Sequence, residues 1–226
     1  MSNINPLIFK AYDVRGLYPE ELNEEAAFRI GQAFAVFLER RGLIGQRQII
    51  VGRDMRLSSD DLFDALAQAL ASQSFDVIDI GRVSTPFFYW AVISQKSAGG
   101  IMITASHNPA QYNGLKLYGE GAFPFGAASG LEEIKALALK SKVVSIAAAP
   151  GRLQEKNLWS GYLEFIKNKV DLSRIKPLKI IVDCGNGMMG PEIEKLIGDL
   201  PLKVEILFGE PDGNFPNHEA NPFKEE

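Results

Sequence analysis

Residues 99–118 constrain the fold more than any other part of the chain. Ile101–Ala105 is a short apolar run that follows two glycines and is rich in β-branched residues, which is typical of a buried strand. The polar segment Ser106–Pro109 ends this run, because proline disfavours helix at the residue before it and asparagine favours turns. A second turn at Tyr112–Gly114 leads into Leu115–Tyr118, which predicts a returning strand. The chain must therefore accommodate a strand pair with a polar loop at one end.

Short apolar runs alternate with helical patterns along the chain. The segment from Asn23 to Arg41 predicts a helix, because Asn23 can cap it and its apolar residues recur at helical spacing. Phe87–Ser94 is apolar on nearly every side, which indicates burial all round. Alternation of strands and helices is typical of an α/β fold. Further helices are predicted from Ser58 or Ser59 onward and at 85–94, 131–139 and 157–170, and further strands at 48–53, 76–80, 179–183 and from Lys203.

Length and charge narrow the classes of function. The 226 residues permit one large or two ordinary domains, and 46% hydrophobic with 23% charged residues is the composition of a soluble globular protein. With 24 basic and 28 acidic residues, the net charge of -4 gives no general attraction to nucleic acid or to an anionic membrane. Neither is an expected partner, and any site for an anion must be local.

Cysteine usage and the N-terminal residues indicate the compartment. Cys184 is the only cysteine, which excludes an intramolecular disulfide and suits a reducing environment. Residues 1–10 lack the charged and apolar regions of a signal peptide, and apolar runs such as Phe87–Ile93 are too short to span a bilayer. We therefore expect a cytoplasmic protein, and the sequence does not indicate its oligomeric state.

The polar segment after the first strand is a candidate site. An isolated Ser-His-Asn-Pro is ordinarily a turn in which Ser106 and Asn108 bond to their own backbone. Three features weaken that interpretation: the loop has no acidic residue, Lys116 follows on the next strand, and the strand before the loop is strongly apolar. Polar loops that are held by strands in this way often carry functional residues.

Ser106 is a candidate nucleophile, although not of the hydrolase type. His107 is its neighbour in a segment taken as extended, so the two side chains are predicted to point to opposite sides. The other histidine, His218, lies far along the chain, and no Gly-x-Ser-x-Gly elbow is present. A serine without a strong base works best when it carries or receives an activated group. Phosphoryl transfer fits this requirement, since it depends mainly on positioning and on cations.

Charged residues also gather after the predicted strand at 48–53. Arg53, Asp54 and Arg56 lie there in close succession. Charges of opposite sign this near to one another commonly pair. We expect an ion-pair cluster that shapes the domain, not a group of catalytic residues.

Several of these segments together resemble one family. Thr104–Pro109 followed by Tyr112–Lys116 is similar to the phosphoserine loop of the α-D-phosphohexomutases, which include phosphomannomutases and phosphoglucomutases. The resemblance covers nearly the whole chain. It implies an α/β fold with a mixed sheet flanked by helices in a first mutase domain, followed by a truncated second α/β domain. Other segments that resemble family motifs, in the same order, are Lys10–Gly16, Val51–Ser58, Asp79–Pro86, Val182–Gly187 and Glu210–His218.

The resemblance also implies a domain organisation. Residues 1–152 correspond to the phosphoserine domain, residues 153–175 to a linker helix, and residues 176–226 to an incomplete second domain. An irregular boundary is predicted at 147–151. Family members carry an Asp-Gly-Asp-x-Asp-Arg metal loop and two further domains, which this sequence lacks. We expect the chain to be the N-terminal part of a longer enzyme and to be inactive alone.

The implied reaction interconverts hexose 1-phosphate and hexose 6-phosphate, of mannose or glucose, through a bisphosphorylated sugar. Hexose phosphates and a hexose bisphosphate are therefore the implied partners. Tyr12 is expected to pack beside the loop. The resemblance assigns catalytic roles to Ser106, Lys116, Arg15 and His107, and substrate contacts to Tyr12, Arg15, Asn108 and Lys116.

Most of these residues have an implied task. Ser106 carries the phosphoryl group, and its phosphate is one ligand of Mg²⁺, an ion that prefers phosphate and carboxylate oxygens. The remaining ligands are family aspartates that are not in this sequence. Lys116 and Arg15 offset developing charge and help to move protons. His107 and Asn108 orient the loop.

Two alternative functions remain open. One is a non-catalytic module that binds or responds to phosphosugars. The other is a nucleotide-binding site, with Glu205 or Glu210 as a ribose partner. Pro191 counts against the second, because it places the helix start later than a nucleotide site prefers. The glycines that suggest the nucleotide site can equally permit a tight turn and close packing: Gly185, Gly187 and Gly190.

Overall fold

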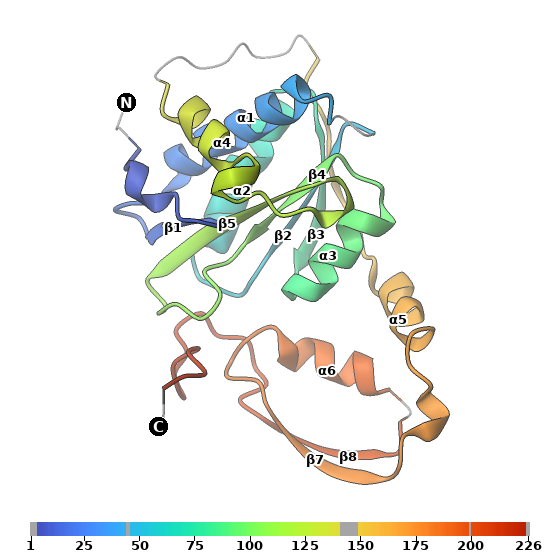
Figure 1. Ribbon diagram of the computed structural model, residues 1–226. Helices are drawn as coiled ribbons and strands as arrows, with labels where there is room; N and C mark the ends of the chain where they lie inside the picture. Colours follow the sequence, from blue (N-terminus) through green and yellow to red (C-terminus); the bar gives the residue numbers. More distant parts are fainter. Residues whose placement is uncertain (1–3, 44–45, 141–148, 199, 225–226) are drawn as a thin grey trace.

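The computed structural model describes residues 4–43, 46–140, 149–198 and 200–224. Within these residues the chain forms a six-stranded sheet and a two-stranded sheet (Figure 1). The order across the larger sheet is β1-β5-β4-β2-β3-β6. Its strands are β1 (Val14–Leu17), β2 (Gln48–Arg53), β3 (Asp76–Arg82), β4 (Gly99–Ile103), β5 (Tyr112–Gly119) and β6 (Leu153–Glu155).

Strand directions make the larger sheet mixed, as predicted. β4 and β5 run antiparallel, with Met102 opposite Lys116, because the polar loop between them reverses the chain. β1 also pairs antiparallel with β5. β2 runs parallel to both β3 and β4, so the carboxyl ends of these three strands lie at the same edge. In α/β folds this edge is where ligands bind.

One face of the larger sheet is covered by α1 (Glu24–Arg40), α2 (Ser59–Ala71) and α4 (Leu131–Ala138) (Figure 1). Alternate strand residues, among them Ile49, Ile101 and Leu115, are buried in this core, as the two-residue period of strands requires. The predicted cap of α1 is confirmed, because Asn23 Oδ1 accepts the N–H of Ala26 at 3.0 Å.

The opposite face carries α3 (Thr85–Ser94) and α5 (Trp159–Lys167). Ile50 and Met102 pack on this side with Phe87 of α3. The prediction that α3 is buried all round is wrong, since Tyr89 and Ile93 are exposed. The helix covers the sheet with one face only, and its other face remains at the surface.

The segment predicted to be a linker helix, residues 153–175, begins with a strand. Leu153–Glu155 form β6, which pairs parallel with β3 at the edge of the larger sheet. The helix in this segment, α5, is also shorter than the predicted 157–170. A strand of Leu-Gln-Glu has no apolar alternation, so the backbone groups of β3 determine where it lies. The boundary predicted at 147–151 includes residues 147 and 148, which lie outside the described residues.

The smaller sheet pairs β7 (Leu178–Asp183) with β8 (Leu202–Leu207) in parallel, and α6 (Met189–Ile197) connects them (Figure 1). The part of the chain that forms this sheet contacts the rest through α6 and through residues 213–215, which pack on Arg56. The backbone N–H of Ser84, just before α3, donates to Glu192 Oε1 at 2.6 Å. The Lys195 ammonium lies 4.3 Å from the centre of the Trp159 ring in α5.

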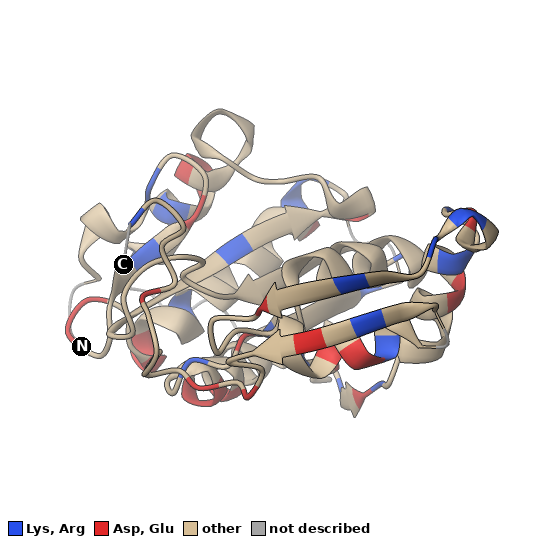
Figure 2. Ribbon diagram, turned by 90° about the horizontal axis from the view of Figure 1, so that it is seen from below, with Lys and Arg blue, Asp and Glu red and all other residues tan. Residues whose placement is uncertain are grey.

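Basic and acidic residues are interspersed on the side shown in Figure 2, including the strands of the smaller sheet. In the part of the chain that the structure describes, no helix has both the length and the apolar character needed to cross a membrane.

Short 3₁₀ helices occupy Pro6–Ile8, Glu120–Ala122, Ala127–Ser129 and Leu172–Arg174.

Candidate active site

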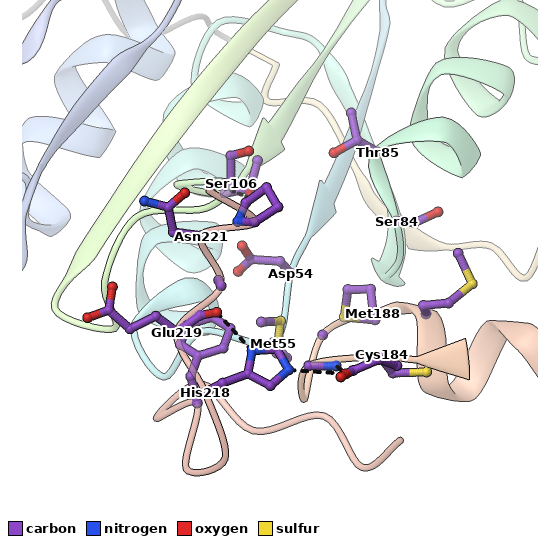
Figure 3. A pocket seen from close by; sticks show the side chains of 18 of the residues that line it. Asp54, Met55, Ser84, Thr85, Ser106, Cys184, Met188, His218, Glu219 and Asn221 are labelled. Atoms are coloured by element: carbon purple, nitrogen blue, oxygen red, sulfur yellow. Dashed lines mark hydrogen bonds and ion pairs between the residues drawn. The ribbon is translucent and has the colours of Figure 1, made fainter. Parts of the chain in front are cut away.

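A cavity of about 680 Å³ lies at the carboxyl ends of β2, β3, β4 and β7 (Figure 3). Asp54 follows β2, Ser84 follows β3 and Ser106 follows β4, and all three line the cavity. The other wall comes from the turn after β7 and from residues between Phe215 and Lys224. The cavity therefore has the position that ligands take in open α/β sheets.

Ser106 leaves β4 in a left-handed backbone conformation. Its φ is 56°, in a region that residues other than glycine seldom occupy. Its N–H donates to Thr104 Oγ1 at 2.9 Å, which fixes the first peptide of the loop. The exposed Ser106 side chain lines the cavity (Figure 3). The loop thus presents one hydroxyl from a rigid strand end.

His107 lies closer to the Ser106 hydroxyl than predicted. Its Nδ1 is 3.4 Å from Ser106 Oγ, at the long end of the hydrogen-bond range. The prediction that the two side chains point apart is wrong, because it assumed an extended backbone, whereas Ser106 has a positive φ. The imidazole can accept or donate this bond according to its tautomer.

Asn108 closes the loop onto the end of β4. Its backbone N–H and its Nδ2 both donate to the carbonyl oxygen of Ala105, at 3.1 and 2.7 Å. Asparagine commonly stabilises turns through bonds of this kind. The side chain therefore holds the loop's own backbone, and a contact with substrate stays a prediction.

Asp13 joins two of the predicted residues. Its buried carboxylate lies 3.3 Å from Lys116 Nζ and 3.3 Å from Arg15 Nη2. Strand register explains the cluster: Lys116 lies opposite Met102 and Arg15 opposite Gly114, which places both cations on the face where Met102 lines the cavity. Sequence reasoning missed Asp13, because only the pairing of β1 with β5 brings Lys116 beside it.

The structure places the six predicted residues in different groups. Among them, only Ser106 belongs to the described residues that line the cavity, and His107 adjoins it in the loop. Lys116 and Arg15 meet at Asp13. The predicted packing of Tyr12 beside the loop is wrong, since Tyr12 is 80% exposed and its ring lies next to Gly126.

Arg56 binds the backbone of residues 104–111, which connect β4 to β5 and are called the Ser106 loop. Its side chain is fully buried, and Nη1 donates to the carbonyl oxygens of Pro109 and Tyr112 at 2.7 and 2.9 Å. Nη2 donates to the carbonyl oxygens of Ser106 and Asn108 at 3.0 and 2.6 Å. One planar guanidinium thus satisfies three carbonyl groups of the loop and that of Tyr112 at the start of β5, which a point charge such as an ammonium does poorly.

Asp54 compensates the buried charge of Arg56. Its Oδ2 lies 3.3 Å from Arg56 Nε, and its Oδ1 accepts the Arg56 N–H and the Ser59 hydroxyl at 3.1 and 2.9 Å. Burial lowers the pKa of Arg56, and Asp54 acts in the opposite sense. The predicted ion-pair cluster is confirmed for Asp54 and Arg56, whereas Arg53 pairs outside it, with Asp60 and Asp79, each at 2.7 Å. The loop contacts of Arg56 were not predictable, because their acceptors lie 50 to 56 positions along the chain.

His218 lies across the cavity from Ser106 (Figure 3). Its Nε2 is 3.1 Å from Asp183 Oδ1, and its Nδ1 is 2.9 Å from the carbonyl oxygen of Glu219. The bond from His218, together with the N–H of Gly185, lowers the pKa of Asp183. This wall therefore offers an ionised carboxylate already bonded to an imidazole.

Packing accounts for Gly190, one of the glycines after β7. A Cβ on Gly190 would lie 1.6 Å from the carbonyl oxygen of Gly209, so α6 can approach the chain there only through glycine. In the same turn, Asn186 Nδ2 donates to the carbonyl oxygen of Glu210 at 3.0 Å, and Asn217 Nδ2 donates to Asn186 Oδ1 at 2.8 Å. These contacts favour the structural interpretation of the glycine pattern over nucleotide binding.

Family models match most of the chain. The model described as "Phosphoglucomutase/phosphomannomutase, alpha/beta/alpha domain I" matches residues 6–143. The corresponding model for "alpha/beta/alpha domain II" matches residues 160–226. The first match contains the Ser106 loop, and the second contains the turn after β7.

Curated relatives agree with the family models. A protein named "Phosphohexose mutases" from Xanthomonas campestris pv. campestris (strain B100) is 41% identical over 222 residues, which covers 96% of this chain and 47% of the relative. The phosphomannomutase of Escherichia coli (strain K12) is 39% identical over 221 residues, with 95% and 47% covered. The chain therefore spans about half the length of the curated relatives that it matches.

Solved structures share the fold. A phosphoglucomutase/phosphomannomutase family protein from Burkholderia thailandensis superposes with a TM-score of 0.82 at 33% identity, covering 96% of this chain and 47% of that one. A putative phosphomannomutase from Thermus thermophilus gives a TM-score of 0.81 at 28% identity, with 98% and 49% covered. Sequence models, relatives and structures thus agree, and the chain belongs to the phosphoglucomutase/phosphomannomutase family.

Proposed function

We propose that this chain carries the phosphoserine of a phosphohexomutase, an isomerase that works by phosphoryl transfer. The observation that carries the proposal is the placement of Ser106, which leaves β4 with a φ of 56° and lines a cavity of about 680 Å³. Because phosphoryl transfer relies on positioning, a hydroxyl on a rigid loop suits it. Relatives named for phosphohexose and phosphomannose mutases support the same class of reaction.

In the proposed reaction, Ser106 starts with a phosphoryl group on Oγ. The bond from Oγ to phosphorus breaks as a free hydroxyl of a hexose monophosphate bonds to the phosphorus, which gives a hexose bisphosphate. The other phosphoryl group of the bisphosphate then returns to Oγ. The acceptor hydroxyl loses its proton in the first step, and the sugar oxygen freed in the second step gains one. Hexose 1-phosphate and hexose 6-phosphate interconvert with phosphate conserved.

Lys116 and Arg15 are proposed to stabilise the transferring phosphoryl group and to assist proton movement. Both contact Asp13 at 3.3 Å, which holds the two cations together on one sheet face. Cations positioned in advance stabilise charge that develops during transfer. His107 and Asn108 are proposed to orient the loop, His107 through its contact with Oγ and Asn108 through Ala105.

The proposed substrates are the 1- and 6-phosphates of glucose or mannose. The exposed ring of Tyr12 can offer an apolar face to a sugar, while Asn108, Lys116 and Arg15 offer polar donors. Donors of this kind recognise phosphate and hydroxyl groups without distinguishing one hexose from the other. Both sugars therefore belong in the assay.

Mg²⁺ is the cofactor that the family resemblance implies, with the phosphate of Ser106 as one ligand. Within the described residues, no group of three or more His, Cys, Asp or Glu side chains is placed to hold a metal ion. With the phosphate of Ser106 as a ligand, Mg²⁺ would offset charge on the transferring group, while the serine and the chain's own cations act as described above.

Turnover of hexose phosphates by the protein in its full natural length tests the proposal. A coupled assay with glucose 1-phosphate and mannose 1-phosphate should show conversion to the 6-phosphates. Ser106→Ala should abolish it without loss of folding, because Ser106 is exposed. Turnover in Ser106→Ala equal to that of the parent would contradict the proposal. Stable phosphate on Ser106 that never exchanges with sugar phosphates would instead support the binding or regulatory module.

A further inference from the structure

We propose that Arg56 is the positioning residue of the Ser106 loop and that residues 213–215, which follow the smaller sheet, hold Arg56 in place. The sequence did not indicate a catalytic role for Arg56 or for residues 213–215. The catalytic consequence of this inference rests on the proposed function. The structural part, a loop held by Arg56 and Phe215, does not.

The contacts of Arg56 fix the loop at both of its ends. Nη2 bonds the carbonyl oxygen of Ser106 itself, and Nη1 bonds that of Tyr112, where β5 begins. Ser106 has a positive φ, a conformation that costs energy in a residue other than glycine and persists only where the surroundings impose it. The bond from Arg56 to the Ser106 carbonyl is one of the contacts that impose it.

The orientation of these carbonyls also matters for an anion. The peptide bond is planar and trans, so the N–H of His107 is antiparallel to the Ser106 carbonyl. Because that carbonyl points at the Arg56 guanidinium, the N–H of His107 is directed away from it. The peptide after Ser106 thus has its N–H directed away from the buried cation, and a backbone donor that is free of the arginine can bind a negatively charged group.

Residues that follow β8, the last strand of the smaller sheet, cover Arg56. The Arg56 guanidinium lies 5.2 Å from the centre of the Phe215 ring, within the range of cation–π attraction. A Cβ on Gly213 would lie 2.9 Å from Arg56 Cα, so the backbone of this segment packs directly on the arginine. The segment is anchored in turn, because the N–H of Asp212 donates to the carbonyl oxygen of Asn186 at 2.9 Å. Contacts thus run continuously from the turn after β7 to the Ser106 loop.

Amide hydrogen exchange of residues 104–114 in the folded chain tests the inference. Arg56→Lys keeps the charge opposite Asp54 but loses the planar fork, so exchange in the loop should rise about tenfold or more. Arg53→Lys is the matched control: its partners Asp60 and Asp79 lie outside the loop, so it should lower stability and leave loop exchange unchanged. Loop exchange equal to the parent in folded Arg56→Lys would overturn the inference.

Phe215→Ala provides the second variant, in case Arg56→Lys does not fold. Phe215 is only partly buried, so its loss should leave the sheets intact while loop exchange rises about threefold. Unchanged loop exchange in this variant would overturn the proposed link through residues 213–215. In the full natural length of the protein, the same variants should lower kcat more than they change KM. If the parent shows no turnover, the proposed function fails while the exchange result still decides the role of Arg56.

Discussion

Asp13 is the residue on which the two candidate catalytic cations converge. Its carboxylate contacts Lys116 and Arg15 on neighbouring strands and is buried, while the two cations remain partly exposed. A carboxylate placed between two cations restricts where each can point. We therefore regard Asp13 as a positioning residue for the proposed phosphoryl transfer.

Asp13→Asn tests this role in the full natural length of the protein. Turnover should fall about 10-fold to 100-fold, because an amide lacks the charge that holds both cations. Folding should persist, since asparagine has the same shape and both cations reach solvent. Asp60→Asn is the matched control, because Asp60 also bridges two arginines, Arg53 and Arg82, at the surface. Parent-like turnover in Asp13→Asn would contradict the assignment.

Sequence reasoning found the residues whose signal is local and missed those whose partners are distant. Ser106 could be predicted at a strand end because an apolar run stops at a turn sequence there. The role of Arg56 could not, since its acceptors are brought to it by the tertiary fold. The contact between His107 and Ser106 was mispredicted because a positive φ at a serine leaves no mark in the sequence.

Among the secondary-structure elements, too, those with a local sequence signal were predictable and those that depend on distant partners were not. Most helices and strands were predictable from periodicity, and the mixed sheet was implied by the family resemblance. β6 was not, because Leu153–Glu155 is short and mostly polar and pairs only where β3 offers its edge. The exposed face of α3 was missed because a helix that is apolar all round gives no indication of which side meets the core.

The close approach of α6 to Gly209 gives a prediction at the scale of elements. Gly190→Ala places a Cβ where the Gly209 carbonyl oxygen lies 1.6 Å away, so helix and chain must separate. We expect a loss of about 2 kcal/mol or more in the free energy of unfolding, measured by denaturant titration. Gly187→Ala is the control, since its Cβ would lie 3.1 Å from the nearest atom and cost less. Equal effects of the two substitutions would contradict the packing account.

At the scale of the whole molecule, Glu192 joins the part built on the smaller sheet to the rest. It is 2% exposed and accepts the N–H of Ser84 at 2.6 Å. Burial raises the pKa of Glu192 above its ordinary value near 4.5, although Ser84 and Lys195 act in the opposite sense. The contact between the two parts should therefore depend on pH.

The sign of this dependence follows from linkage. A carboxyl whose pKa is higher in the folded state binds its proton more tightly there, so its stabilising contribution is present at low pH and is lost as pH rises through the raised pKa. Glu192→Gln should remove that loss. Free energies of unfolding from pH 4 to pH 8 should then show the parent declining relative to the variant above about pH 4.5. Parallel curves for the two proteins would contradict the role of Glu192.

The central claim is that Ser106 carries the phosphoryl group, and the position of the phosphate tests it most directly. The protein in its full natural length would be incubated with glucose 1,6-bisphosphate and examined by intact mass and peptide mapping. We predict a single phosphate on the peptide that contains Ser106 and none in Ser106→Ala, because Ser106 is the serine on the loop that faces the cavity from β4. Phosphate on Ser58, Ser84 or Ser129, or its retention in Ser106→Ala, would contradict the account.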